Sequence, residues 1–327
     1  MSSHPQDPDL DFLQEIGEGP IATVYRALDR STNREVAVKV LHSERLADAQ
    51  SATQLVDAMN LLSILEHPNL IRVTYQDAKQ HRIVMEKMKC GLDTRIKKES
   101  VSPDRAIGIL IQALKGLQCL HNNQHLHAAL KPSNLLVDDR GNVKLSDPQG
   151  VKIGEPLPPR CQTHRYLAPE VISPSSGPIG PALDLYCLGF TTLELLKGPG
   201  FDEILGCEST QNPTQRWLQI HKLPLEKIPG IADIFSQLPP HLARVLARLT
   251  RREVGRRYTD AAQVIDEIES GNSFSEIGTS TRKPTETVPD LPPKQPSHRA
   301  RWAGLISVAV CFGILLGLLV YFNSRPH

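Results

Sequence analysis

The pattern of apolar residues changes character between residues 88 and 103, and this change constrains the fold more than any other feature of the sequence. Residues 11–88 contain short runs rich in β-branched side chains, each bounded by turn residues, which is the pattern of strands. The expected strands are Phe12–Ile16, Thr23–Leu28, Glu35–Leu41, Ile71–Gln76 and Arg82–Glu86. One helix, about Ala47–Leu65, interrupts them, because its leucines and a methionine recur at helical spacing.

From about residue 103 onward, apolar residues recur mostly at the spacing of helices. The clearest case spans Ala106–His121 and follows Ser102-Pro103-Asp104, a typical helix-start signal. Later helices are expected at Ala182–Leu196, Pro240–Thr250 and Asp260–Glu269. We therefore predict an α+β fold with two lobes, in which a small β-rich N-lobe (11–88) precedes a larger helical C-lobe (89–270). Residues 1–10 are expected to form a flexible N-terminus.

Composition excludes several classes of protein. The 327 residues include 37 Lys+Arg and 36 Asp+Glu with 5% aromatics, so the chain lacks the basic footprint of a nucleic-acid binder. The six cysteines are scattered without a C-x-x-C pair, which argues against a disulfide scaffold or a structural zinc site and suits a reducing cytosol. The polar, proline-containing N-terminus is not a secretory signal.

A segment without charged residues lies near the C-terminus. Residues 302–322 form a run of 21 uncharged positions, enough for a helix to cross a hydrocarbon core of ~30 Å. Trp302 and Tyr321 suit the two membrane interfaces. Positive residues before the span, including Arg299 and Arg301, predict that the preceding domain faces the cytoplasm. We therefore expect a single-pass, C-terminally anchored membrane protein with one transmembrane helix.

The segment before this span has the composition of a linker. Residues 271–301 contain five prolines, many Ser and Thr, and few large apolar side chains. A short tail, 323–327, follows the span. A buried core helix is the alternative interpretation of 302–322, and we disfavour it because no downstream domain remains to bury it. Gly313 and Gly317 could let two spans approach closely, which would allow self-association.

Six short motifs follow one another in the soluble part. They are Ile16-Gly17-Glu18-Gly19, Val36-Ala37-Val38-Lys39, His67-Pro68-Asn69-Leu70, Leu130-Lys131-Pro132-Ser133-Asn134, Lys144-Leu145-Ser146-Asp147 and Tyr166-Leu167-Ala168-Pro169-Glu170. A glycine-rich turn lets backbone N–H groups approach phosphates, but a tight hairpin explains such a turn equally well. Each motif alone has an ordinary structural explanation, whereas their joint order and spacing do not.

In this order the motifs make residues 11–268 resemble the eukaryotic-type Ser/Thr protein kinase family. The resemblance implies a two-lobed fold that binds Mg–ATP and transfers its γ-phosphate to protein hydroxyls. Asp184 resembles the buried aspartate of the family's αF helix. Arg257 resembles the late arginine that pairs with the glutamate of the A-P-E motif, here Glu170.

The catalytic-loop triplet departs from the family pattern. Where the family has H-R-D, this chain has His127-Ala128-Ala129. Ala129 cannot accept the substrate hydroxyl's proton, and loss of a placed base costs ~10²–10⁴ in rate. Ala128 replaces an arginine that receives an activation-loop phosphate, and residues 148–162 contain no Ser, Thr or Tyr. We therefore expect a loop that phosphorylation does not switch. Thr163, the first later hydroxyl, occupies the family's substrate-loop threonine position, and we expect it to be structural or vestigial.

Other departures from the family pattern affect residues that bind ATP and Mg²⁺ in the family. The αC-glutamate position holds Ala58, and the adjacent Asp57 is turned by ~100° on a helix. Pro148-Gln149 follows Asp147 where the family has Phe-Gly, and proline stiffens this hinge. Pro20 removes one N–H from the glycine-rich loop, and Ala22 replaces its third glycine.

A partial nucleotide site remains, as implied by the resemblance. The expected nucleotide-contacting residues are Gly17, Gly19, Val24, Ala37, Lys39, Glu86, Met88, Asn134 and Asp147. Asn134 and Asp147 would hold one Mg²⁺, Met85 would precede the hinge, and Lys131 is a residual catalytic-loop lysine. The alternative is that these residues serve folding alone. His127 is expected to be a core histidine, whereas His121 and His125 are expected at the surface or in loops.

Three functional hypotheses follow. The leading one is a membrane-tethered pseudokinase that acts as a signalling scaffold for an unidentified protein partner and retains an ATP site. The second is a divergent active Ser/Thr kinase that works slowly through positioning and Mg²⁺ alone, or with a base supplied from elsewhere. The third, a membrane sensor, is poor because five residues beyond the span are too few for a receptor domain.

Overall fold

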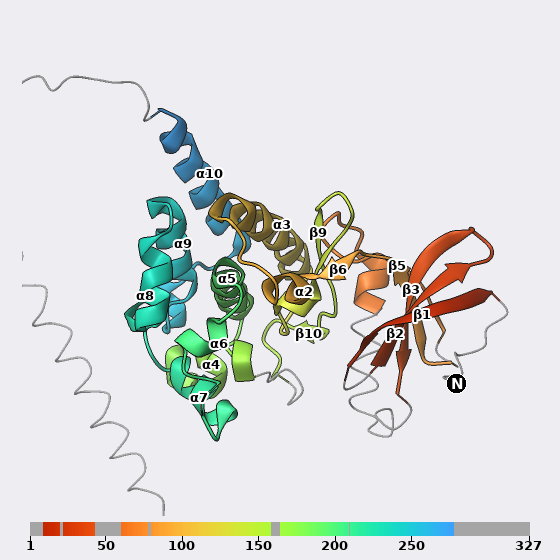
Figure 1. The fold of residues 1–327 in the computed structure, drawn as a ribbon, viewed down its shortest axis with the longest axis horizontal. Coiled ribbons are helices and arrows are strands. Elements are labelled where there is room, and N and C mark those ends of the chain that lie inside the picture. Colours follow the sequence, from red (N-terminus) through yellow and green to blue (C-terminus); the bar gives the residue numbers. More distant parts are fainter. Residues whose placement is uncertain are drawn as a thin grey trace, which may run out of the picture. The chain divides into compact units, whose positions relative to one another are not determined.

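The computed structural model describes residues 9–19, 22–42, 60–77, 80–157, 164–208 and 210–277, with side chains described as far as Gly271. Residues 1–8 of the expected N-terminus, Ala58 with Asp57, Pro20 and Thr163 lie outside these residues. So do the predicted linker beyond Ile277, the predicted span 302–322 and Gly313 with Gly317. The flexible N-terminus was predicted to reach residue 10, but Leu10 is buried and begins the first strand. Within the described part, a β-rich lobe lies beside a larger helical lobe (Figure 1). This is the predicted two-lobed α+β arrangement.

The N-lobe is built on one antiparallel sheet with the strand order β1-β2-β3-β5-β4. The strands are β1 (Leu10–Glu18), β2 (Ala22–Asp29), β3 (Arg34–Leu41), β4 (Val73–Asp77) and β5 (Arg82–Glu86). Alternation along β3 sends Val36 and Val38 into a small core on one face and Ala37 into the main core on the other. Lys39, two residues after Ala37, lies on the same face as Ala37 and is buried.

The helix expected at Ala47–Leu65 is described only at its end. Residues 60–64 are helical, and Leu61 and Leu62 are buried against the main core. A connection at residues 65–72 then leads into β4.

The C-lobe consists mainly of helices. They are α2 (Leu92–Ile96), α3 (Pro103–Asn122), α4 (Pro169–Ile172), α5 (Pro181–Lys197), α6 (Phe201–Ile204), α7 (Pro213–Ile220), α8 (Pro229–Ser236), α9 (Pro240–Leu249) and α10 (Ala261–Ile277). Single turns of 3₁₀ helix are η2 (Pro132–Asn134), η4 (His164–Tyr166), η5 (Pro174–Ser176), η6 (Leu225–Lys227) and η7 (Val254–Arg256). Helices α3, α5, α9 and the first half of α10 match the predicted ones, whereas α2, α4, α6, α7 and α8 were not predicted.

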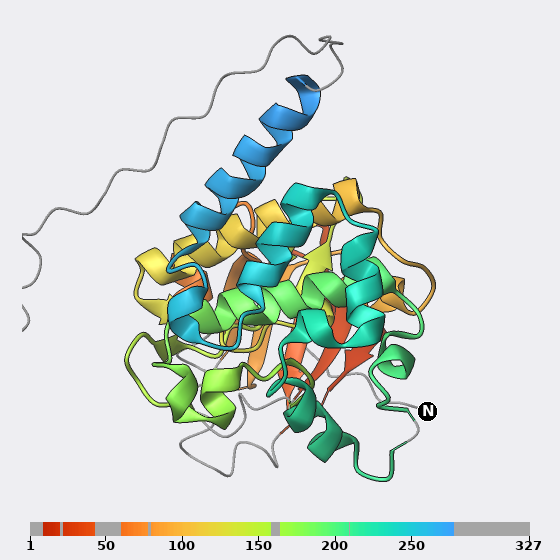
Figure 2. The ribbon, with the colours of Figure 1, turned by 90° about the vertical axis from the view of Figure 1, so that its left-hand side faces the viewer.

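Helix α5 is the centre of this lobe, since all but its ends are buried. It packs between α3 and α9, and α10 packs on both α3 and α9 (Figure 2). Helix α10 continues to Ile277, past residue 270 where we expected the C-lobe to end. The predicted linker boundary was therefore too early.

Two small sheets of short strands hold the loops of the C-lobe that contain the motifs at residues 130–134 and 144–147. Strands β6 (Cys90–Gly91), β8 (Leu135–Val137) and β9 (Val143–Leu145) form one small sheet, and β7 (His125–Leu126) pairs with β10 (Val151–Lys152). Among the helices that the structure describes, none is both long and apolar enough to cross a bilayer.

Candidate functional site

A buried carboxylate fixes the loop that connects β7 to η2. Asp184, in α5, is fully buried and accepts hydrogen bonds from the backbone N–H groups of His127 and Ala128, each at 2.8 Å. The Nε2 of His121 lies 2.9 Å from the same carboxylate. Burial opposes ionisation of Asp184, but these partners hold the pKa of its carboxyl below the usual value. Asp184 therefore has the structural role that we predicted.

The predictions for the two histidines near Asp184 differ in outcome. His127 is fully buried, its Nε2 donates to the backbone oxygen of Ser146 at 3.0 Å, and burial lowers its pKa. It is a core histidine, as predicted. The expectation for His121 was wrong, because its side chain is buried and pairs with Asp184. Its place near the end of the amphipathic α3 hid this, since the end of a helix commonly lies in solvent.

Lys39 and Asp147 meet between the two lobes. Lys39 Nζ donates to Asp147 Oδ1 at 2.6 Å; the lysine side chain is 8% exposed and the aspartate side chain 37% exposed. Burial raises the pKa of Asp147, but the charge and hydrogen bond of Lys39 outweigh this effect and leave the pKa below its usual value. Asp147 is therefore an ionised carboxylate that is partly open to solvent. Its backbone φ of 57° lies in the left-handed region, which is uncommon outside glycine.

The second expected Mg²⁺ ligand lies beside the first. Asn134 accepts a backbone hydrogen bond from Ser146, the neighbour of Asp147, at 3.0 Å. Its side-chain Nδ2 donates to the backbone oxygen of Ala129 at 2.8 Å. The structure thus brings Asn134, Asp147 and the alanine at the base position into one small region.

A narrow apolar hollow lies next to Ala129. It is lined by residues 128–131 and 166–168 together with Leu157, Val171, Leu183 and Cys187. Among the described residues of this lining, Lys131 is charged and none is acidic. Asp138 and Asp139 lie in the turn between β8 and β9, where Asp138 caps the backbone N–H groups of Arg140 and Asn142. Among the residues described, no carboxylate stands in for the missing base in this hollow.

The glycine-rich turn joins β1 to β2. Gly17 pairs with Val24, and the backbone N–H of Gly19 donates to Ala22 O at 2.9 Å. A Cβ added at Gly17 or Gly19 would meet no atom closer than 3.6 Å. Packing among the described residues therefore does not demand glycine at either position, and the open space suits close approach of a ligand.

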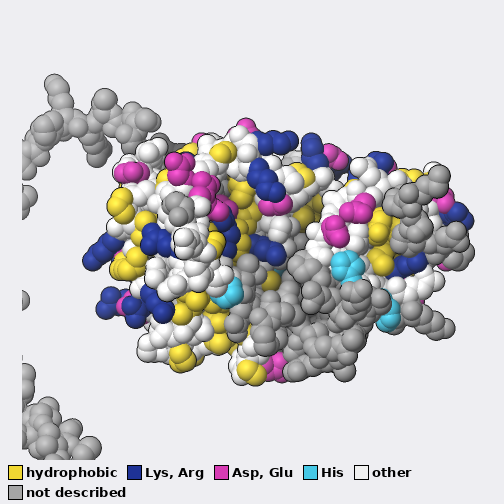
Figure 3. Space-filling view, turned by 60° about the horizontal axis from the view of Figure 1, so that its bottom comes forward, with side chains coloured by type: hydrophobic (Ala, Val, Ile, Leu, Met, Phe, Trp, Pro, Cys, Tyr) yellow, Lys and Arg dark blue, Asp and Glu magenta, His cyan; other side chains and the backbone are white. Residues whose placement is uncertain are grey.

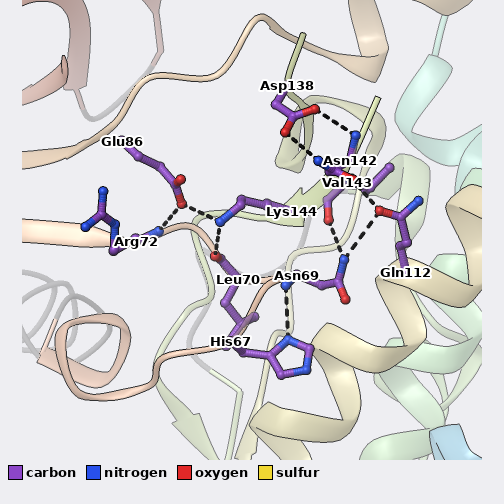
Figure 4. A network of polar contacts seen from close by, with 10 residues as sticks. All are labelled: His67, Asn69, Leu70, Arg72, Glu86, Gln112, Asp138, Asn142, Val143 and Lys144. Carbon is purple, nitrogen blue, oxygen red and sulfur yellow. Dashed lines mark hydrogen bonds and ion pairs between the residues drawn. The ribbon is translucent and has the colours of Figure 1, made fainter. Parts of the chain in front are cut away.

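The predicted hinge residues lie at the end of β5. Met85 is buried in the main core, and Met88 packs against that core. Glu86 turns its side chain into a polar network, where its Oε1 accepts from Lys144 Nζ and from the backbone N–H of Arg72, both at 2.7 Å (Figure 4). This side chain is therefore not available to a nucleotide, and any contact from Glu86 would come from its backbone.

The same network explains the His67-Pro68-Asn69-Leu70 motif. Asn69 Nδ2 donates to the backbone oxygen of Val143 at 2.9 Å, and its backbone N–H donates to Nδ1 of His67 at 3.1 Å (Figure 4). Gln112, from α3, accepts the N–H of Val143 at 2.8 Å. The motif thus joins the connection before β4 to β9 and α3. Sequence reasoning placed Lys144 in a motif but missed its pairing with Glu86, and it missed Gln112 altogether, because neither residue type signals a partner so distant in the chain.

Glu170 and Arg257 form a fully buried bidentate ion pair, with N···O distances of 2.8 and 2.7 Å. The Arg257 guanidinium also donates to the backbone oxygen of Ala182 at 3.0 Å. The pair joins the start of α4 to the segment before α10, as predicted. Because both charges are enclosed, removal of either partner would leave a buried charge alone.

Comparison with known sequences identifies the family behind this geometry. The family model described as the protein kinase domain matches residues 10–268. The chain belongs to the protein kinase family. The two lobes, the Asp184-anchored loop and the Glu170–Arg257 pair are therefore parts of a protein kinase fold.

Curated relatives include Ser/Thr kinases from distant organisms. A "Probable serine/threonine-protein kinase" of Bifidobacterium longum is 29% identical over 79% of this chain and 34% of its own length. Cyclin-dependent kinase 7 of Carassius auratus is 33% identical over 73% of this chain and 76% of its own length. Cyclin-dependent kinase 10 of Mus musculus is 29% identical over 90% of this chain and 86% of its own length. The chain thus spans only about a third of the bacterial relative.

Protein kinase domains generally use ATP and Mg²⁺, and the donor atoms present here fit one such ion. Mg²⁺ takes oxygen ligands and is commonly held by one or two protein groups together with substrate phosphates. Asp147 supplies an ionised, partly exposed carboxylate, and Asn134 supplies a side-chain amide beside it. The assignments of the other nucleotide contacts remain predictions.

Proposed function

We propose that this chain is a pseudokinase, a protein kinase domain that retains a nucleotide site but has little or no phosphotransfer activity. In this proposal Lys39, Asn134 and Asp147 bind Mg–ATP, and the domain acts as a signalling scaffold for a protein partner. A bound Mg²⁺ would neutralise part of the phosphate charge of ATP. Lys39 would hold the phosphates, and Asp147 with Asn134 would hold the ion.

One observation carries the proposal. Ala129 presents a methyl group at the position of the catalytic base, and the hollow beside it is lined by no carboxylate among the described residues. The two carboxylates described at the neighbouring nucleotide site are both engaged, Asp147 with Lys39 and Glu86 with Lys144. A substrate hydroxyl entering beside Asn134 would therefore find no acceptor for its proton.

Restoration of the base tests this proposal. Ala129 is partly exposed, so Ala129→Asp can be accommodated, and Ala129→Asn is a control of similar shape without a base. We expect purified wild type and A129N to transfer no measurable ³²P from ATP to a generic protein substrate. A129D should raise the rate by about 10²-fold or more above background, and Lys39→Met should abolish that gain.

Two results would overturn the proposal. One is phosphotransfer by the wild-type chain that Lys39→Met removes. The other is an A129N variant as active as A129D, since an amide cannot act as the base.

A divergent active kinase is the alternative, and a specific observation favours it. Lys39, Asn134 and Asp147 are already close together, and the loop that carries Ala129 is held by Asp184. Positioning and Mg²⁺ alone would then carry a slow reaction. The wild-type arm of the same assay decides between the two functions.

Membrane attachment is a further part of the proposal and rests on the sequence of residues 302–322 alone. A single span there would tether the domain in the cytoplasm, and Gly313 with Gly317 would let two chains associate. The full chain should float with vesicles after carbonate extraction, with its N-terminus open to protease on the cytoplasmic side. Release by carbonate, or an N-terminus on the outer side, would contradict this part of the proposal without bearing on phosphotransfer.

A further inference from the structure

The segment just before the A-P-E motif contains an arginine with an unusual number of partners. Arg165 lies in η4, and its guanidinium bridges two carboxylates, Glu194 at the end of α5 (2.5 Å) and Asp202 in α6. The guanidinium also lies over the ring of Trp217 in α7, 4.7 Å from the ring centroid. One side chain therefore ties this segment to three consecutive helices.

Tyr166 and His221 add further hydrogen bonds around the Arg165–Glu194 pair. Tyr166 donates its hydroxyl to the second oxygen of Glu194 at 2.8 Å, and the backbone oxygen of Arg165 accepts from Nε2 of His221 at 3.0 Å. Glu194 is nearly buried, at 3% side-chain exposure, whereas Arg165 is 24% exposed. A buried carboxylate depends strongly on its partner, because an unpaired charge in such a place is costly.

The position of this cluster, just before the A-P-E motif, indicates that it orders this segment. Kinase-type segments of this kind are commonly ordered by a phosphate that binds an arginine. Here Ala128 cannot receive a phosphate, and residues 148–157 contain no hydroxyl side chain. The guanidinium of Arg165 supplies a permanent positive charge between two carboxylates, which needs no modifying enzyme.

We propose that Glu194, Asp202 and Trp217 form a guanidinium-binding site filled by the chain's own Arg165, and that this clamp fixes residues 164–168 without phosphorylation. Tyr166 belongs both to the clamp and to the hollow beside Ala129. The clamp therefore also sets the shape of one wall of that hollow. Arg165 is a positioning residue in this scheme and touches no reacting atom.

Chemical rescue provides the test. In the full chain, Arg165→Ala should lower the melting temperature by about 5–10 °C, and the amides of residues 164–172 should exchange about tenfold faster. Millimolar guanidinium chloride, compared with equal NaCl, should restore slow exchange in R165A by occupying the vacant site. The double variant R165A/Glu194→Gln should not respond, because the carboxylate that binds guanidinium is gone.

Matched variants separate the clamp from a general loss of stability. Arg251→Ala breaks an exposed pair with Glu226 (2.8 Å) and should leave exchange at residues 164–172 unchanged. If R165A does not fold, Arg165→Lys should still fold and show faster exchange confined to the same residues, since lysine keeps the charge but has a single nitrogen where two guanidinium nitrogens reach Glu194 and Asp202.

Phosphorylation is tested separately. Thr163→Ala and phosphatase treatment should leave the exchange of residues 164–172 unchanged. Three results would overturn the inference: unchanged exchange in R165A and R165K, equal rescue of R165A by NaCl and by guanidinium, or slower exchange that depends on phosphorylation.

Discussion

Single buried side chains connect the segments that form the candidate site. His221 illustrates this, since its ring bridges the hydroxyl of Tyr186 (2.8 Å) and the backbone oxygen of Arg165 (3.0 Å) and is fully buried. Burial lowers the pKa of His221 to about 4. The folded protein therefore keeps this ring neutral at pH values where an exposed histidine is protonated.

This difference predicts acid sensitivity. Between pH 6.5 and about 4 the unfolded chain takes up a proton at His221 that the folded chain does not, so acid favours unfolding. The contribution to the free energy of unfolding is present above pH 6.5 and decreases by about 3 kcal/mol as the pH falls to about 4. Urea denaturation at pH 7 and pH 4.5 would measure it.

The control is His221→Gln, which can still donate to the backbone oxygen of Arg165. The variant should be less stable at pH 7, yet lose less stability than wild type between the two pH values. His127 is also buried with a lowered pKa, so some acid sensitivity should persist in the variant. An identical loss in both proteins would contradict the assignment to His221.

At the residue scale, sequence alone identified the groups that belong to recurring motifs. Lys39, Asn134, Asp147 and Asp184 lie together as their motifs indicated. His121 and Arg165 were not identified as important, because their partners lie 63 and 29 residues away in the chain. No local pattern encodes such pairs, which arise only when α3, α5 and η4 are packed together.

At the scale of elements, close approach of α3 to its neighbours yields a second prediction. A Cβ added at Gly116 would lie 2.7 Å from the backbone oxygen of Asn69 and 3.0 Å from the Leu145 side chain. Gly108 lies in the same helix, and a Cβ there would meet nothing within 4 Å. Gly116→Ala should therefore destabilise the protein by about 2–4 kcal/mol, because a backbone atom cannot move aside cheaply.

Gly108→Ala is the matched control, because it makes the same substitution in the same helix. It should stabilise the protein by about 0.5–1 kcal/mol, the gain expected when alanine replaces glycine in a helix interior. Chemical denaturation of both variants measures the difference. Equal changes in the two would mean that helix propensity, rather than contact with Asn69, governs both positions.

The predictability of elements follows their length and periodicity. The five N-lobe strands and the long helices α3, α5 and α9 were predicted to within a few residues, because each shows a sustained period. Helices α7 and α8 are only eight residues long, too short for a clear helical period. The end of α10 was missed because polar Gly-Asn-Ser-containing sequence resembles a linker.

At the scale of the whole molecule, two ion pairs bridge parts of the N-lobe sheet and the C-lobe. Lys39 in β3 contacts Asp147, which follows β9, and Glu86 at the end of β5 contacts Lys144 in β9. Both C-lobe partners come from the same short stretch of chain. A ligand that binds Lys39 and Asp147 together would thus act on both lobes at once.

Nucleotide binding should therefore stabilise the molecule as a unit. ATP with Mg²⁺ at about 100 times its Kd would add about 2.7 kcal/mol, a rise of about 5–10 °C in melting temperature. Thermal unfolding with ATP, with AMP and with each ±Mg²⁺ would measure this effect. Asp147→Asn should remove the Mg²⁺-dependent part, and no rise for wild type at millimolar Mg–ATP would contradict a retained nucleotide site.

The hydrogen bonds between Asp184 and the backbone of its loop have a consequence for which substitutions such a domain can accept during evolution. Its carboxylate binds main-chain N–H groups, which every residue except proline possesses, at positions 127 and 128. The His127 ring adds a bond to the backbone oxygen of Ser146, and Ala128 has a left-handed φ of 57°, which disfavours bulky or β-branched residues there. None of these contacts involves the side chain at position 129, so the course of the loop does not depend on which residue stands there. A chain of this kind can lose its chemistry one side chain at a time, while the surface it offers to other proteins stays intact.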